Sequence, residues 1–326
     1  MMTSSDDITI ERFESDKASE WKSFLGSSNN GTLFHDLDFL SYHPEGRFDT
    51  HHLMFYRDGK LIAVLPAAVV TDPDGRRFLK SPYGASVGGI VLPPHMSTRS
   101  ILDIVGKLQE YIRTLGLDGI EMRLGPFIYM RHFSQSLEFA LAVRKFVLNA
   151  RWLCFIKPLE DYEQSGGLFS ERKRRYVRSR LREGMFPREA DVSGLDAFYA
   201  LLMETMERLN ARPTHQKEEL ELLFKLVPGR LRLFLCRHRD VEIAGALVFM
   251  LNEFAAYTFH IVGKNESQGN TVLTQHVISQ MANEGIKYLD MGPSASTYHF
   301  NEGVVRFKEL IGTQGFCRDE WRWECK

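Results

Sequence analysis

The chain of 326 residues carries 41 Lys and Arg against 42 Asp and Glu, and 44% of its residues are hydrophobic. This length can fill one large core or two of ordinary size, and the balanced charge excludes a global field that would attract nucleic acid or membrane. The four cysteines show no CxxC pairing, which argues against structural zinc and against a secreted disulfide framework. With a polar start and no long apolar run, we expect a cytoplasmic protein without a membrane span.

Strand and helix patterns alternate along the first half. Residues 50–70 contain two β-rich runs joined at Asp58-Gly59, a dipeptide typical of a tight hairpin turn. An extended run loosened by glycines follows, and residues 98–115 then show helical spacing. The next strand, "DGIEMRLGP", ends in Gly-Pro.

The same order of elements returns in the second half. After a basic helix and two further helices, two β-rich runs turn near Arg239-Asp240, and a third strand, a helix and the strand "IKYLDMGP" follow. The pattern therefore predicts an α/β chain of mixed (α+β) sheets, made of two copies of one β-β-β-α-β unit. We place the units at residues 1–158 and 159–326.

An antiparallel three-strand meander followed by a helix and a strand resembles the core of the GNAT fold. Two such units in tandem, the basic helix that opens the second, and the segment Phe307-Lys308-x-x-x-Gly312 together resemble the FemAB-like, peptidoglycan-bridge-forming branch of these acyltransferases. The resemblance covers the chain from about Trp21. It implies transfer of an acyl or aminoacyl unit from acyl-CoA or aminoacyl-tRNA to an amine, at a cleft between or beside the units.

The resemblance places the donor's pyrophosphate at the junction "HIVGKNESQGNTVL", where helix N-terminal amides and the helix dipole favour anions. The residues that suit such a loop are Ser267, Gly269, Asn270 and Thr271. The usual GNAT signature, Gln/Arg-x-x-Gly-x-Gly/Ala, is not reproduced, because alignment on Gly269 puts Glu266 at its first position. An ordinary polar turn explains the segment equally well. We therefore expect no tightly bound cofactor and keep acyl-CoA as a candidate cosubstrate.

The corresponding stretch of the first unit, "SPYGASVGGIVLPPHMST", has less of the signature. Its small residues let a ligand approach the backbone, so Tyr83 and Ser86 are candidates to line an acceptor cleft.

The segment "SERKRRYVRSRLREG" is the strongest local concentration of charge. Arg174, Arg175 and Arg178 lie close together on the predicted helix and could clamp the phosphates of a nucleotide-linked acceptor or of tRNA. The alternative is a solvated helix paired with acidic neighbours. DNA is not an expected partner, because no helix-turn-helix or zinc pattern accompanies the run.

Lys308 is the candidate catalytic residue. It follows Phe307 in a segment with helical apolar spacing, and the family resemblance places a functional lysine there. Its ammonium could hold the oxyanion that forms when an amine attacks an activated carbonyl. An exposed helical lysine is the alternative. Since no Ser-His-Asp order or nucleophile elbow occurs, we expect direct transfer rather than an acyl-enzyme.

Asp290 ends the strand "IKYLD", where a carboxylate can orient the amine, accept its proton, or cap the next loop. Further candidates to position polar groups of a small-molecule substrate are His260, Ser294, Ser296, Tyr298 and His299. A lone histidine is more often structural, and no histidine spacing matches HExxH, so no metal is predicted.

Two functions remain open from the sequence. The first is an N-acyltransferase that acts on an amine of a cell-envelope or nucleotide-sugar precursor. The second is a catalytically inactive GNAT-like binding or scaffold protein, suggested by the degenerate signature. The long helical arm of some tRNA-dependent members is not evident, which argues against assuming aminoacyl-tRNA as the donor.

Overall fold

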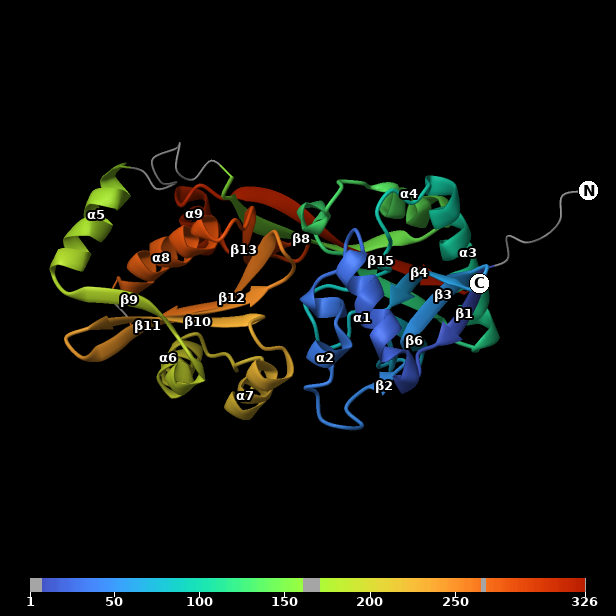
Figure 1. The fold of residues 1–326 in the computed structure, drawn as a ribbon, viewed down its shortest axis with the longest axis horizontal. Coiled ribbons are helices and arrows are strands. Elements are labelled where there is room, and N and C mark those ends of the chain that lie inside the picture. The colour runs from blue at the N-terminus through green and yellow to red at the C-terminus, as the bar shows by residue number, and fades with distance from the viewer. Residues whose placement is uncertain (1–7, 161–170, 265–267, 326) are drawn as a thin grey trace, which may run out of the picture. The chain divides into compact units, whose positions relative to one another are not determined.

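The computed structural model describes residues 8–160, 171–264 and 268–325 (Figure 1). The chain divides into two compact units: a first unit of Met1–Trp152 with Cys317–Lys326, and a second unit of Leu153–Phe316. The boundary predicted after residue 158 and the division after Trp152 both fall within strand β8 (Val147–Pro158).

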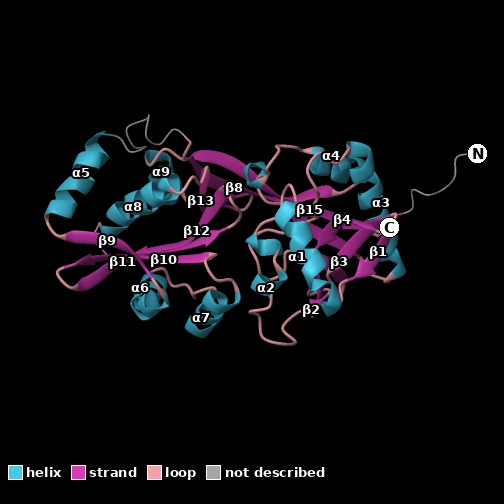
Figure 2. Cartoon of the chain, in the orientation of Figure 1, coloured by secondary structure: helices cyan, strands magenta, loops and turns pink. Residues whose placement is uncertain are grey.

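Two sheets form the framework of the first unit, one with strand order β1-β3-β4 and one with order β2-β5-β6-β7-β15 (Figure 2). The strands are β1 (Ile8–Arg12), β2 (Asp49–Thr50), β3 (Leu53–Arg57), β4 (Lys60–Leu65), β5 (Ala68–Thr71), β6 (Arg77–Ser81), β7 (Gly119–Arg123) and β15 (Gln314–Glu324). The helices are α1 (Ala18–Ser27), α2 (Leu37–Leu40), α3 (Thr98–Thr114) and α4 (Ser136–Val143), with 3-10 turns at Ser15–Lys17, Leu33–His35 and Phe127–Tyr129.

The predicted hairpin turn of the first unit is present. Asp58 and Gly59 have φ of +50° and +72°, the left-handed conformation that a two-residue turn of this type requires. The meander itself differs from the prediction, because Pro66 separates β4, which pairs with β3, from β5, which pairs with β6. Proline has no N–H to donate to a ladder, so the run is split between two sheets.

Helix α3 buries the predicted apolar face. Ser97 caps it by accepting a hydrogen bond from the Ser100 amide at 3.1 Å, and Ile104 and Leu108 are fully buried. These residues belong to a core that α3 and α4 share with strands of both sheets. Trp21 of α1 packs in a smaller cluster with Met54 and Val64.

The second unit has strand order β9-β10-β11-β12-β13, with β14 paired to β13. Its strands are β9 (Met185–Ala190), β10 (Leu231–His238), β11 (Val241–Met250), β12 (Ala255–Gly263), β13 (Tyr288–Ser296) and β14 (His299–Phe300). Its helices are α5 (Glu171–Arg182), α6 (Leu195–Arg208), α7 (Lys217–Leu226), α8 (Gly269–Asn283) and α9 (Glu302–Leu310), with a 3-10 turn at Val192–Gly194. Helices α8 and α6 pack on opposite faces of the sheet (Figure 1).

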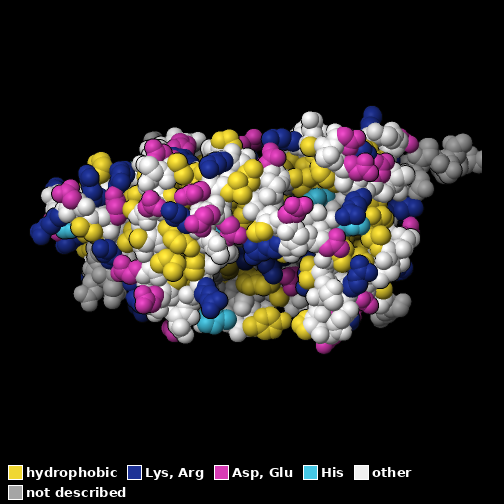
Figure 3. All heavy atoms as spheres, turned by 90° about the horizontal axis from the view of Figure 1, so that it is seen from below, with side chains coloured by type: hydrophobic (Ala, Val, Ile, Leu, Met, Phe, Trp, Pro, Cys, Tyr) yellow, Lys and Arg dark blue, Asp and Glu magenta, His cyan; other side chains and the backbone are white. Residues whose placement is uncertain are grey.

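The second unit contains the predicted order of elements. Arg239 and Asp240 have φ of +48° and +63° and form the turn between β10 and β11. Strand β12 then leads through α8 to β13, which pairs with β12 in parallel. On the face of the molecule in Figure 3, acidic and basic side chains are interspersed.

The two units differ where their parallel strands separate. In the second unit the described register of β12 and β13 ends at Tyr257 and Asp290. In the first unit β6 and β7 pair as far as Ser81 and Met122. Beyond that point, the loop after β6 returns and pairs with the end of β7 in place of β6. The amide of Gly88 donates to the Arg123 carbonyl at 2.8 Å. The loop that follows β6 therefore fills the gap in the first unit, whereas the gap in the second unit stays open.

Replacing Gly88 by Ala should destabilise the first unit. A Cβ at Gly88 would lie 2.5 Å from Ser81 Oγ and 2.7 Å from the backbone nitrogen of Pro82, so the backbone would have to shift at a cost of about 1–3 kcal/mol. Thermal denaturation followed by circular dichroism should show a lower midpoint for Gly88→Ala. Gly26→Ala is the matched control, because no atom lies within 4 Å of its new Cβ and alanine favours the helix. Equal midpoints for the two variants would contradict this packing.

Candidate active site

A cavity of about 450 Å³ lies in the second unit where β12 and β13 separate. It is lined by Tyr257, Thr258, Phe259, His260 and Ile261 of β12, Asn270 of α8, Met291, Gly292 and Pro293 of β13, and Val304, Phe307 and Lys308 of α9. A β-bulge interrupts the pairing of β11 with β12 at Phe259, whose ring stacks on Phe249 with 4.8 Å between centroids. Bulges of this kind change the direction of side chains and often lie beside functional sites.

Lys308 is buried at the edge of this cavity, with 8% of its surface exposed. Its Nζ donates to the Gly292 carbonyl at 2.8 Å and lies 5.7 Å from the centroid of the Phe155 ring. Burial lowers the pKa of Lys308 to about 8, although the nearby Asp290 carboxylate favours the charged form. The alternative of a simple exposed lysine therefore does not describe Lys308.

Asp290 lies next to Lys308 but is fully buried and does not line the cavity. Its Oδ1 accepts a hydrogen bond from the Gly292 amide at 2.6 Å, which is the loop-capping contact weighed from the sequence. Gly292 has φ of +77°, a conformation that favours glycine, and its carbonyl accepts from Lys308. Asp290 and Lys308 thus bind the same residue, Gly292: Asp290 accepts a hydrogen bond from its N–H, and Lys308 donates one to its carbonyl.

A second buried lysine fixes the other end of α9. Lys157 of β8 is 2% exposed, and its Nζ donates to the carbonyls of Ile311 and Gly312 at 2.8 and 2.9 Å. These carbonyls follow the last turn of α9, where a helix lacks internal partners and a cation is favoured. Burial lowers the pKa of Lys157 to about 8. Lys157 was not among the residues predicted from the sequence, although a lysine in the apolar run "CFIKP" was a visible signal.

Helix α8 begins within the segment that the sequence marks as a candidate site for the donor's pyrophosphate. Gln268 has φ of +54° and its side chain does not cap α8, Gly269 is buried, and Thr271 is half-buried in the first turn. The Oδ1 atom of Asn270 is buried without a hydrogen-bond partner in the described part of the chain and belongs to a residue that lines the cavity. Ser267 and Glu266 lie outside the described residues.

The basic helix α5 contacts the elements that form the cavity. The Tyr176 hydroxyl is hydrogen-bonded to Gln268, and the Nζ of Lys173 lies 5.5 Å from the centroid of Phe307. Arg175 is ion-paired with Glu171, and Arg174 is half-buried. Arg178 is exposed and makes no ion pair with the residues that the structure describes. One arginine of the helix, Arg175, is therefore neutralised by an acidic neighbour, as the alternative interpretation expects. Another, Arg178, is exposed to solvent and could contact an anionic ligand.

The remaining candidates of the second unit differ in their exposure. His260 lines the cavity, and burial lowers its pKa to about 4, so its imidazole is neutral at pH 7. Ser294 Oγ is buried without a partner among the described residues, and Ser296 Oγ accepts from the Tyr298 amide at 3.2 Å. Tyr298 is 77% exposed, and the neighbouring His299 is also exposed.

Tyr83 and Ser86 lie in the first unit, away from the residues of this cavity in the chain. Tyr83 is 5% exposed, and its ring packs against Phe48, His43 and His52. Its hydroxyl is 3.2 Å from His52 Nε2. Tyr83 is thus part of a buried aromatic cluster, and Ser86 is half-buried in the loop after β6.

Two further properties bear on function. Within residues 8–160, 171–264 and 268–325, no three His, Cys, Asp or Glu side chains are grouped so that they could hold a metal ion. No helix in these ranges is long and apolar enough to cross a membrane.

Comparison with known proteins identifies the fold. Residues 170–300 match the acetyltransferase (GNAT) domain family, and no curated protein matches the sequence. The structure is similar to that of FemX, with a TM-score of 0.73 at 14% identity over 97% of both chains. It is also similar to L-PGS from Bacillus licheniformis, with a TM-score of 0.59 at 12% identity over 96% of this chain and 93% of that one.

A third similar structure is a tandem GNAT protein from the clavulanic acid biosynthesis pathway, with a TM-score of 0.56 at 10% identity over 98% of both chains. Likeness at such low identity establishes the fold and not the substrate. The predicted α/β fold of two GNAT-like units is confirmed. The chain therefore has the tandem GNAT fold of these proteins, and its residues 170–300 match the GNAT acetyltransferase domain family.

Proposed function

We propose that this chain is an N-acyltransferase that moves an acyl or aminoacyl group directly from an activated donor to an amine of a cell-envelope or nucleotide-sugar precursor. The observation that carries the proposal is the cavity between β12 and β13 with the buried Lys308 at its edge. A cavity of this kind with a few convergent polar groups is the usual form of a small-molecule site.

The proposed chemistry uses the open strand gap. The donor's carbonyl lies in the cavity, and the amine nitrogen of the acceptor attacks its carbon to form the new C–N bond. The carbonyl electron pair moves onto oxygen, where the Lys308 ammonium stabilises the negative charge. When the intermediate collapses, the bond to the donor's sulfur or oxygen breaks, and the amine's proton passes to the leaving group or to solvent. An ammonium has three donors, and the Gly292 carbonyl accepts one of them.

Asp290 acts in this scheme through Lys308 rather than on the substrate. Its carboxylate holds the Gly292 amide and favours the charged form of Lys308. We assign it as a positioning residue. His260, neutral at pH 7 and on the cavity wall, is better placed to accept a hydrogen bond from the attacking amine.

Replacing Lys308 by Met should remove turnover and leave the fold intact. The substitution keeps the length of the side chain in the buried site and deletes the charge, so we expect the rate of transfer to fall by about 100-fold or more. The assay measures thiol release from acyl-CoA and transfer from labelled aminoacyl-tRNA, each with a panel of amine acceptors. Lys287→Met is the control, since Lys287 is exposed and paired with Glu160.

A Lys308→Met variant as active as wild type would overturn the assignment of Lys308. A wild-type chain that binds donor but transfers nothing to any acceptor would instead support the binding or scaffold function.

The pH dependence of kcat/KM tests the charge state of Lys308. Its pKa of about 8 means that the ammonium is populated below pH 8 and is lost as the pH rises through that value. Activity should therefore decline above about pH 8, whereas protonation of the acceptor amine reduces it at low pH. In Lys308→Arg the guanidinium stays charged, so the residual activity should show no decline near pH 8. The same alkaline decline in both proteins would exclude Lys308 as its source.

The donor can be distinguished through α5. If the donor is aminoacyl-tRNA, Arg172→Glu with Arg178→Glu should weaken its binding by about tenfold or more at low salt and reduce the salt dependence, because phosphate contacts are lost. Arg212→Glu, a charge reversal in the loop after α6, is the control. Calorimetry with CoA is the complementary measurement. Micromolar CoA binding that is unaffected by the α5 variant would favour acyl-CoA as the donor.

A further inference from the structure

Helix α4 of the first unit is apolar on both of its faces. Leu137, Ala140 and Leu141 are buried in the core, yet on the outer face Phe139 and Val143, one turn apart, are 57% and 46% exposed. A helix that is apolar all round is normally buried. The outer face of α4 therefore lacks the polar residues that a solvated helix carries.

The one charged residue of α4, Glu138, does not make the outer face of the helix polar. Glu138 has its Oε2 atom buried, and burial together with the Asp319 charge raises the pKa of its carboxyl group. The carboxylate thus points away from solvent while the phenyl ring of Phe139 faces it. In a protein surrounded only by water, the carboxylate would normally be exposed and the phenyl ring buried.

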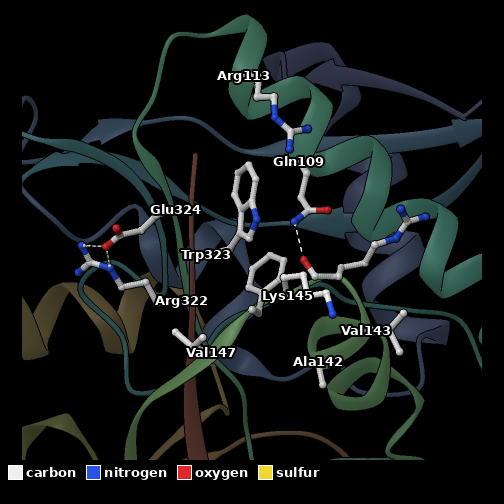
Figure 4. A pocket seen from close by; sticks show the side chains of 11 residues that line it. Gln109, Arg113, Ala142, Val143, Lys145, Val147, Arg322, Trp323 and Glu324 are labelled. Atoms are coloured by element: carbon white, nitrogen blue, oxygen red, sulfur yellow. Dashed lines mark hydrogen bonds and ion pairs between the residues drawn. The ribbon is translucent and has the colours of Figure 1, made fainter. Parts of the chain in front are cut away.

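A groove of about 870 Å³ borders α4 on the Val143 side (Figure 4). Gln109 and Arg113 of α3 lie along one side, and Ala142, Val143 and Lys145 lie along the other, with Trp323 of β15 between them. Val147, at the start of β8, extends the apolar wall of the groove and is 61% exposed. The exposed apolar surface is therefore contiguous with a lined depression.

The groove carries positive charge that the described residues do not neutralise. Arg113 and Lys145 are exposed and make no ion pair within the described chain, and the guanidinium of Arg113 lies 4.9 Å from the Trp323 centroid. The acid in the lining, Glu324, is already paired with Arg322. An occupant of this surface should accordingly offer negative charge beside apolar groups.

We propose that the outer face of α4 and the adjoining groove are a docking surface for an anionic phospholipid bilayer. Exposed Phe and Val side chains enter the acyl boundary, and Arg113 and Lys145 meet the lipid phosphates, which is the pairing of features that holds peripheral proteins at anionic interfaces. A free phosphate would not use Phe139 and Val143, and a neutral apolar partner would not use the two cations.

Vesicle co-sedimentation of the full chain, without donor or acceptor, tests this proposal separately from the proposed transferase activity. Vesicles of phosphatidylglycerol with phosphatidylcholine should bind the protein at low salt, and binding should fall at high salt. Vesicles of phosphatidylcholine alone should bind much less. Reversing Arg113 and Lys145 to Glu should weaken binding by at least about fivefold for each residue. Phe139→Ser with Val143→Ser should weaken it by about tenfold or more.

The matched controls are Lys60→Glu, an exposed cation of the first unit, and Leu209→Ser, an apolar residue of the second unit that is 63% exposed. Both should bind vesicles as wild type does, and circular dichroism should confirm that every variant is folded. The proposal is overturned if wild type does not bind anionic vesicles, binds neutral ones equally, or binds as well after the α4 substitutions. A concentration-dependent dimer in light scattering that Phe139→Ser with Val143→Ser abolishes, without vesicle binding, would assign the surface to a second copy of the chain.

Discussion

The site in the second unit depends on the hydrogen bond between the buried ammonium of Lys308 and the carbonyl of Gly292. A charge taken out of water must be paired or hydrogen-bonded, so this contact fixes α9 against the end of β13. Asp290 holds the amide of Gly292 and its negative charge favours the ammonium form of Lys308, and Lys157 fixes the far end of α9. These three contacts hold α9 and the end of β13 in place. The side chains of α9 therefore line the cavity between β12 and β13 instead of filling it.

The duplicated unit is used in two different ways. In the second unit, β12 and β13 separate and leave a cavity. In the first unit, Gly88 returns the chain to β7, and a glycine is required because any Cβ there would meet the backbone at Pro82. Pro66 then divides the meander between two sheets. The two copies therefore share an order of elements but not an open gap.

Local patterns explain what could be predicted from the sequence. The Asp58-Gly59 turn, the α3 face and the helix bearing Lys308 depend on residues within a few positions of one another, so spacing and turn chemistry determined them. The burial of Lys308 could not be read in this way, because its partner Gly292 lies in another strand and Phe155 lies far away in the chain. Tyr83 was assigned from its glycine-rich surroundings to a cleft, whereas distant aromatic residues enclose it. The tertiary contacts of single side chains are the part that local sequence does not specify.

The closed gap of the first unit also bears on binding stoichiometry. The loop after β6 occupies the gap between β6 and β7 and is part of the same chain. A covalently attached segment competes for such a site at an effective concentration of about a millimolar. A diffusing molecule would have to displace it together with the hydrogen bond between Gly88 and Arg123. The gap between β12 and β13 carries no such competitor among the described residues. We therefore expect one ligand, and not two, to saturate the strand gaps of one chain, despite the internal duplication of the fold.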